Sequence, residues 1–133
     1  METLENAALQ RGKVLIVDDS STSRMIIQRC MEMAGIEVAS FLFAENGLDA
    51  LAVLREAGPV SLIVTDINMP KMDGQAFLGL LKSDAVTRSI PVIVVSSIAG
   101  AEEDPTLVER GAAAVVKKPV SPAKMLAAVR GIA

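Results

Sequence analysis

Polar side chains stand just past the ends of the predicted strands of this sequence, and their types suit phosphate and divalent metals. They comprise three carboxylates, one hydroxyl and one ammonium group: Asp18, Asp19, Asp66, Ser96 and Lys118. Clustered carboxylates repel one another unless a cation relieves them, and Mg²⁺ prefers carboxylate oxygens, carbonyls and water. If these side chains converge, an aspartate can accept a phosphoryl group while metal and lysine balance the added charge.

The elements that must position these side chains follow from an alternation of apolar runs with amphipathic stretches, the pattern of βαβ units. Strands are predicted at Lys13–Val17, Val38–Phe43, Ser61–Thr65, Val92–Val95 and Ala112–Val116. Helices are predicted to start near Ser20 or Ser21, Asn46, Gly74, Asp104 and Ser121. Strands that are apolar at nearly every position favour a parallel sheet buried on both faces by helices, the doubly wound α/β class. Because parallel strands end at one edge, the polar side chains are expected to converge there.

The length of 133 residues fits one domain, which we place at residues 13–133 behind a flexible N-terminal tail, residues 1–12. The sequence has no stripe of basic residues of the kind that binds nucleic acid. It also has no apolar run of the 18 or so residues that a membrane span needs. The single cysteine, Cys30, and the absence of a signal peptide favour a reducing, cytoplasmic location. The chain contains no histidine, so it cannot carry a phosphohistidine of its own.

The spacing of apolar residues predicts which face of the first helix is buried. Ile26, Cys30 and Met33 share one face by helical spacing, opposite Arg24 and Gln28. Cys30 is therefore expected to be a buried core residue rather than a reactive thiol.

Four sequence motifs resemble those of response-regulator receiver domains, most closely the chemotaxis type. They are Asp18–Asp19 with the following Ser20–Arg24, Asp66–Pro70 with Met72–Gly74, Pro91–Ser96, and Lys118–Pro119. The similarity in order and spacing covers about residues 13–132. It implies a flavodoxin-like sheet with strand order 2-1-3-4-5.

The resemblance also implies a role for each site residue. Asp66 would be the phosphoacceptor, Asp19 would bind Mg²⁺ directly, Asp18 would bind it largely through water, and Asn68 would offer its backbone carbonyl. Ser96 would hydrogen-bond the phosphoryl group and Lys118 would pair with it, with Pro119 distinguishing Lys118 from its neighbour Lys117. The Lys118–Pro119 bond is expected to be cis. A sensor histidine kinase or histidine phosphotransfer protein would donate the phosphoryl group, and an unknown output protein would receive the signal.

The chain departs from many receivers at the residue three positions before the lysine. An aromatic ring there reports phosphorylation to partners, whereas this sequence has Val115. The switch is therefore expected to work through Ser96 and Val115 without a ring.

Two other functions fit parts of the pattern. An aspartyl-phosphate hydrolase also uses a strand-end aspartate with Mg²⁺, but it needs a second acid two residues later, where this chain has Ser20. An unphosphorylated protein-interaction module would need none of the acidic residues or Lys118. Apart from its own phosphorylation and dephosphorylation, the chain is not expected to be an enzyme.

Overall fold

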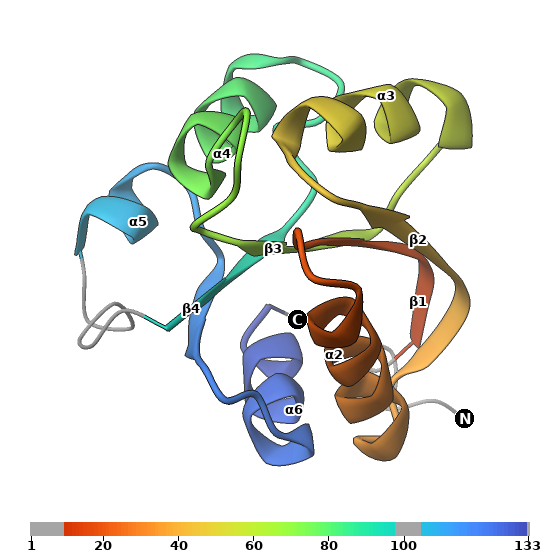
Figure 1. The fold of residues 1–133 in the computed structure, drawn as a ribbon. Coiled ribbons are helices and arrows are strands. Elements are labelled where there is room, and N and C mark those ends of the chain that lie inside the picture. Colours follow the sequence, from red (N-terminus) through yellow and green to blue (C-terminus); the bar gives the residue numbers. More distant parts are fainter. Residues whose placement is uncertain (1–9, 98–104, 133) are drawn as a thin grey trace.

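Five strands form one parallel sheet with helices on both faces (Figure 1). This computed structural model describes residues 10–97 and 105–132. The strands are β1 (Gln10–Val17), β2 (Glu37–Ala44), β3 (Leu62–Asp66), β4 (Val92–Ser96) and β5 (Ala114–Lys117). The helices are α2 (Ser21–Met33), α3 (Gly47–Ala57), α4 (Gly74–Ser83), α5 (Pro105–Glu109) and α6 (Pro122–Arg130).

The strand order is β2-β1-β3-β4-β5, and every neighbouring pair is parallel, as predicted. Strands of one direction place all their carboxyl ends at the same edge. In the register between β3 and β4, Asp66 lies opposite Val95, so Asp66 and Ser96 end adjacent strands. The sheet thereby brings together residues that are far apart in the sequence.

Two apolar cores cover the two faces of the sheet, because successive strand residues point in opposite directions. Val14 and Ile16 of β1 pack with residues of α2 and α6, whereas Leu15 and Val17 pack with residues of α3 and α4. All four of these side chains are fully buried. Burial of each such side chain contributes roughly 1.5–3 kcal/mol, which explains the continuous apolar runs.

Polar side chains cap the starts of four helices, and each accepts a hydrogen bond from the backbone N–H three residues later. The caps are Ser20 (3.2 Å), Asn46 (2.9 Å), Asp73 (2.8 Å) and Ser121 (3.1 Å). A cap of this kind contributes about 1 kcal/mol. The helix after β1 therefore starts from Ser20, the first of the two predicted alternatives.

Two strand starts differ from the sequence prediction by more than one residue. β1 starts at Gln10, so residues 10–12 belong to a strand and not to the predicted tail. β5 starts at Ala114 rather than Ala112. Asp104, the predicted start of the fourth helix, lies outside the described residues. None of the helices in the described ranges has the length and apolar character needed to cross a bilayer.

The apolar face predicted for α2 is wrong in part. Cys30 is buried as expected, but Ile26 is 47% exposed and Met33 is 69% exposed. The helix instead buries Ile27 and Met31 beside Cys30. Two apolar stripes, one through Ile26 and one through Ile27, compete on this helix, and packing against the sheet selects the second.

Candidate functional site

Asp18 follows β1 and is fully buried, with each carboxylate oxygen occupied. The backbone N–H of Ser20 donates to Oδ1 at 2.9 Å. Oδ2 accepts from the hydroxyl of Ser23 at 2.7 Å and from Nζ of Lys118 at 3.2 Å. These donors hold the buried Asp18 carboxylate in one fixed orientation.

Asp66 ends β3 and is 6% exposed. Its Oδ1 accepts the backbone N–H of Ile67 at 2.8 Å and of Asn68 at 3.4 Å. Its Oδ2 lies 3.4 Å from Nζ of Lys118. One oxygen is thus anchored to the loop, while the other faces the lysine.

Burial raises the pKa of Asp66, and the neighbouring Asp18 carboxylate adds to the rise. The Lys118 ammonium and the N–H groups of Asn68 and Ile67 act in the opposite direction, but the pKa stays above its usual value. Burial lowers the pKa of Lys118, yet Asp18 and Asp66 outweigh it and leave that pKa raised. The lysine therefore stays protonated, and a further positive charge would favour ionised Asp66.

Replacing Asp66 with Asn is expected to stabilise the metal-free protein by about 1 kcal/mol near pH 7, because a desolvated charge is removed. A carboxyl group whose pKa is raised by folding stabilises the folded state below its unfolded pKa. This contribution is lost as pH rises through the folded pKa. The advantage of Asp66→Asn should therefore shrink as pH falls, which urea unfolding in EDTA at several pH values measures. An Asn variant less stable than the wild type at neutral pH would contradict the raised pKa.

The three aspartates form a group that can hold a metal ion. Asp18, Asp19 and Asp66 each offer one carboxylate oxygen, and these oxygens lie within 4.8 Å of one another. Asp18 and Asp66 are buried and Asp19 is exposed, so the cluster opens to solvent on one side. An all-oxygen donor set with room for water suits a hard divalent cation such as Mg²⁺, and the residues fit that ion.

Replacing Asp19 with Asn is expected to weaken Mg²⁺ binding at least about tenfold, because it removes one negative ligand. Asp19 is exposed, so the free energy of unfolding without metal should change by no more than about 0.5 kcal/mol. Isothermal titration with MgCl₂ measures the first quantity, and Asp73→Asn, at another exposed acid, serves as the control. Equal affinities for the wild type and Asp19→Asn would exclude Asp19 as a ligand.

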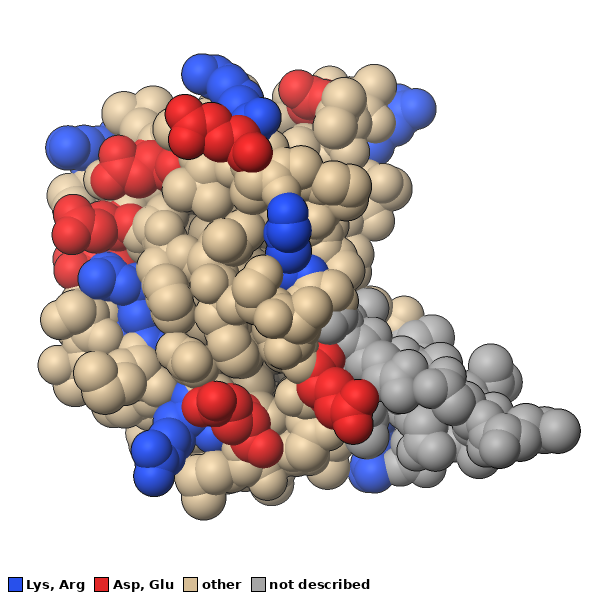
Figure 2. Space-filling model, turned by 90° about the vertical axis from the view of Figure 1, so that its right-hand side faces the viewer, with Lys and Arg blue, Asp and Glu red and all other residues tan. Residues whose placement is uncertain are grey.

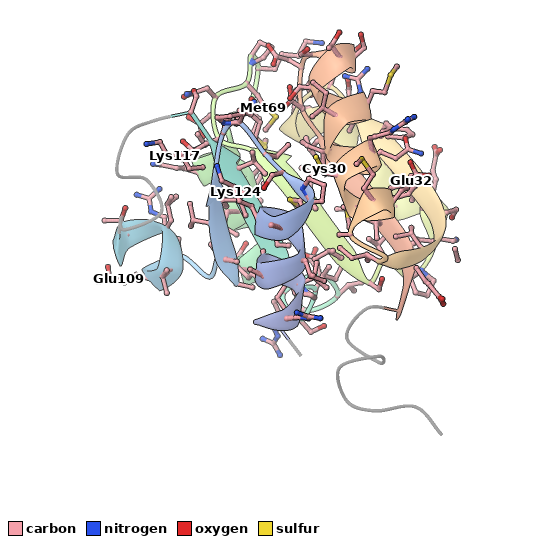
Figure 3. All side chains as sticks on the ribbon, turned by 90° about the horizontal axis from the view of Figure 1, so that it is seen from below. Cys30, Glu32, Met69, Glu109, Lys117 and Lys124 are labelled. Atoms are coloured by element: carbon pink, nitrogen blue, oxygen red, sulfur yellow. The ribbon has the colours of Figure 1, made fainter. Side chains whose placement is uncertain are left out.

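The connection between β5 and α6 holds Lys118 over the two buried carboxylates. The backbone N–H of Lys118 donates to the carbonyl of Ser96 at 2.7 Å, and the Lys118–Pro119 bond is cis. Lys124 donates from Nζ to the carbonyls of Lys117 (3.1 Å) and Pro119 (2.9 Å), and it lies beside this connection in Figure 3. Lys118 is the lysine whose Nζ lies near Asp18 and Asp66, whereas Lys117 is exposed. The phosphate-binding role of Lys118 stays a prediction.

The remaining predicted residues lie around the same edge of the sheet. Ser96 is fully buried at the end of β4, next to β3. Asn68 is exposed two residues after Asp66, and the part of its carbonyl in metal binding stays a prediction. Val115 is half-buried in β5 and packs with the α3–α4 core. The switch roles of Ser96 and Val115 also stay predictions.

Sequence reasoning missed residues that hold the site in shape. Ser23 fixes Asp18 through its hydroxyl, and Nη1 of Arg24 donates to the Asp18 carbonyl at 2.7 Å. Gly74 lies under the loop after β3, where a Cβ atom would stand 2.5 Å from the Asp66 carbonyl oxygen. The Asp73–Gly74 pair indicates a turn, but sequence alone does not reveal this close backbone approach.

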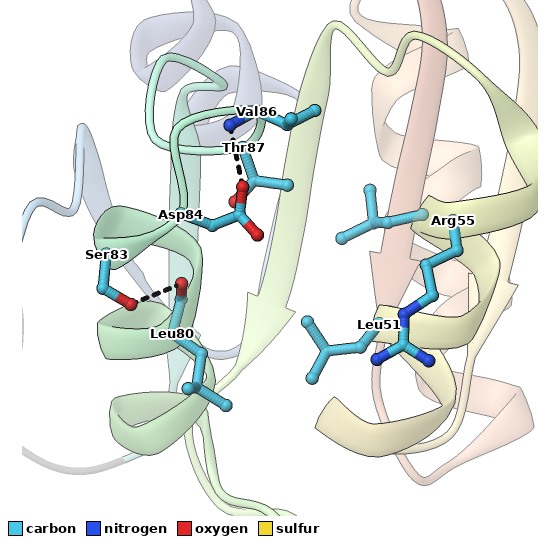
Figure 4. A pocket seen from close by; sticks show the side chains of 8 residues that line it. Leu51, Arg55, Leu80, Ser83, Asp84, Val86 and Thr87 are labelled. Carbon is cyan, nitrogen blue, oxygen red and sulfur yellow. Dashed lines mark hydrogen bonds between the residues drawn. The ribbon is translucent and has the colours of Figure 1, made fainter.

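A separate hollow of about 460 Å³ lies between α3 and the segment after α4 (Figure 4). Leu51, Arg55, Leu80 and Val86 are among its lining residues. It shares no residue with the acidic cluster. Because α3 and α4 return across the sheet, their carboxyl-terminal parts lie at the opposite end from Asp66. The hollow is therefore not part of this site.

Comparison with known proteins agrees with this geometry. Residues 14–130 match the response regulator receiver domain family. "Chemotaxis protein CheY1" of Helicobacter pylori is 34% identical over 110 residues, covering 83% of this chain and 87% of the relative. A "Probable transcriptional regulator ycf27" of Pyropia yezoensis is 34% identical over 123 residues, covering 92% of this chain but only 48% of that protein.

Solved structures show the same fold. The chemotaxis response regulator CheY4 of Vibrio cholerae has a TM-score of 0.78 at 27% identity, covering 92% of this chain and 99% of that one. A chain of the CheX-CheY-BeF3-Mg+2 complex from Borrelia burgdorferi has a TM-score of 0.77 at 26% identity, covering 90% of this chain and 87% of that one. With the family match over residues 14–130 and the site at the carboxyl edge of the sheet, the chain belongs to the response regulator receiver domain family.

Proposed function

We propose that this chain is a phosphoryl-accepting switch of two-component signalling, with Asp66 as acceptor. The donor is the phosphohistidine of a sensor histidine kinase or a histidine phosphotransfer protein, and the signal leaves through an output partner. The observation that best supports this proposal is the asymmetric environment of the Asp66 carboxylate. Its Oδ1 accepts hydrogen bonds from backbone N–H groups, whereas its Oδ2 lies 3.4 Å from Nζ of Lys118. The same carboxylate belongs to the three-aspartate cluster.

The geometry suits an in-line displacement on phosphorus. Oδ2 of Asp66 forms the new O–P bond as the P–N bond to the donor imidazole breaks, and the bonding electron pair stays on the imidazole nitrogen. Lys118 balances the charge brought by the phosphoryl oxygens, and we assign the Ser96 hydroxyl as a donor to one of them. Asp18, Asp19 and Asp66, with the Asn68 carbonyl, would hold Mg²⁺, which when bound would neutralise further charge.

A surface hollow beside the site supports access for the donor. Its volume is about 390 Å³, and its lining includes Ser23, Ile26, Lys118 and Pro119. Lys118 also contacts Asp66, so a donor seated in this hollow would reach the acceptor without crossing the core. The exposure of Ile26 fits an apolar contact with such a donor.

The output step is proposed to differ from that of receivers with a ring. Phosphorylation would draw the buried Ser96 hydroxyl toward the phosphoryl group and shift β4 relative to Val115 on the neighbouring strand. A half-buried valine transmits only a small change in surface shape. We place the protein in the cytoplasm, in line with its single buried cysteine.

Intact mass spectrometry tests the proposal. Incubation with Mg²⁺ and acetyl phosphate should add one phosphoryl group to the wild type and none to Asp66→Asn. No addition with acetyl phosphate or a phosphorylated kinase would favour the interaction module. Sustained turnover of several phosphate esters would favour a hydrolase. Either result would overturn the assignment of a phosphoryl-accepting switch.

A further inference from the structure

β2 is an edge strand with an unusually unprotected outer side. It pairs with β1 on one side, and no strand of the described ranges lies on the other. Natural sheet edges are commonly protected by charged residues, proline or bulges. In β2, Val38–Ala44 contains neither a charged residue nor a proline, and Glu37 is the strand's only charged residue.

The direction of the free backbone groups follows from one hydrogen bond. The Asp18 N–H donates to the Ala44 carbonyl at 3.0 Å, so the backbone groups of Ala44 point toward β1. Backbone groups alternate in direction along a strand. Those of Ala39, Phe41 and Phe43 therefore point outward, away from the sheet.

The side chains around this edge are apolar or small. Phe43 is 42% exposed, Ala39 and Ser40 are exposed, and Phe41 is half-buried. Figure 2 looks at the side of the molecule that carries β2, where uncharged residues fill the middle around a basic side chain. The acidic residues of this view lie mostly toward its margins. An outward row of N–H and C=O groups beside exposed apolar surface is a template for another strand.

We propose that the partner is a second copy of this chain, whose β2 pairs antiparallel with this β2 about a two-fold axis. Such an interface joins the two sheets into one and uses the same surface on both copies. The outward backbone N–H and C=O groups of the two β2 strands can hydrogen-bond to each other only in some registers. In these registers, Ala39, Phe41 and Phe43 lie opposite odd-numbered residues of the other copy. This requirement leaves a small number of registers.

Charge selects between the two registers with the longest overlap. With Ser40 on the axis, each Phe41 lies opposite an Ala39, Phe43 lies opposite Glu37, and Glu45 falls outside the paired strands. With Phe41 on the axis, Glu37 would lie opposite Glu45, and like charges directly opposite are destabilising. The self-complementary register is therefore the one centred on Ser40.

The small area of this interface favours weak, reversible association. Stable interfaces bury roughly 1,200–2,000 Å², and two paired eight-residue strands with their neighbouring side chains fall at or below this range. We therefore expect a reversible dimer that dissociates on dilution. The pairing does not depend on phosphoryl chemistry at Asp66.

Sedimentation velocity between about 5 and 500 μM tests the pairing, because this range covers weak association. The wild type should show a concentration-dependent dimer. Ala39→Pro removes an outward N–H without breaking a bond to β1, as edge strands allow, and should weaken association at least about tenfold. Val86→Lys, which alters a residue that is 81% exposed on the segment after α4, should leave association unchanged.

A cysteine cross-link tests the register independently of Ala39→Pro. Residues opposite each other in a non-hydrogen-bonded antiparallel pair have Cα atoms about 4.5 Å apart, within disulfide range. Ser40→Cys should therefore form a disulfide-linked dimer under mild oxidation, much faster than Ala85→Cys at another exposed position. The wild type controls for Cys30, which is buried. A monomeric wild type across the concentration range, or equal cross-linking of the two cysteine variants, would overturn the proposal.

Discussion

Replacing Lys118 with Met is expected to lower the free energy of unfolding of the metal-free protein by about 2–4 kcal/mol. Lys118 Nζ lies 3.2 Å from Asp18 Oδ2 and 3.4 Å from Asp66 Oδ2. Without the ammonium group, two buried carboxylates would face each other with no positive charge between them. Protonation of Asp66, whose pKa burial already raises, limits the cost. Urea unfolding in EDTA near pH 7 measures the change.

Lys117→Met is the matched control, because Lys117 is the exposed neighbour of Lys118. Its free energy of unfolding should stay within about 0.5 kcal/mol of the wild type. Saturating Mg²⁺ should restore part of the stability of Lys118→Met, since a divalent cation supplies the missing positive charge among the same carboxylates. Equal effects of the two substitutions, or no rescue by Mg²⁺, would show that Lys118 does not balance this cluster.

Replacing Gly74 with Ala is expected to destabilise the protein by about 3 kcal/mol or more and to reduce phosphoryl uptake. An added Cβ would stand 2.5 Å from the Asp66 carbonyl oxygen and 2.6 Å from the Ile67 Cα. Both are backbone atoms, so no side-chain rotation relieves the contact. The Gly74 N–H also donates to the Ile67 carbonyl at 2.8 Å, which ties the start of α4 to the loop after β3.

Gly79→Ala is a control within the same helix. Apart from its chain neighbours and the adjacent backbone of α4, nothing lies within 4 Å of the Cβ position at Gly79. Alanine there should stabilise α4 by about 0.5–1 kcal/mol, the usual helix preference for alanine over glycine. Thermal unfolding and phosphoryl uptake should be measured on both variants. A Gly74→Ala protein with wild-type stability would mean that the loop after β3 tolerates the side chain and that the close backbone approach is not required.

The residues of the candidate site could be predicted from the sequence because they lie at strand ends. Asp18, Asp66 and Lys118 each lie at or just past the end of a largely apolar strand, and a parallel sheet places all such positions at one edge. The topology therefore converts a one-dimensional pattern into a three-dimensional site, and the structure brings these three side chains into contact. The helix starts can also be predicted from the sequence, because Asn46 and Ser121 cap their helices through local hydrogen bonds.

Features that depend on tertiary packing are harder to predict from the sequence. Ile26 and Ile27 are adjacent and equally apolar, so only docking against the sheet decides that Ile27 is buried. The hydroxyl of Ser23 reaches Asp18 because α2 turns immediately after β1, and a serine in a helix gives no sign of this contact. The close approach at Gly74 likewise depends on the path of a loop and not on local sequence preference.

Identification of the phosphorylated residue tests the central claim most directly. An acyl phosphate, unlike a phosphoserine or a free carboxylate, is reduced by borohydride, so the phosphorylated aspartate becomes homoserine. After reaction with acetyl phosphate and Mg²⁺, reduction and peptide mapping should find homoserine at position 66. Addition of EDTA before the phosphodonor should abolish it. Homoserine at Asp18 or Asp19, or phosphoryl uptake without homoserine at position 66, would contradict the assignment of Asp66 as the acceptor.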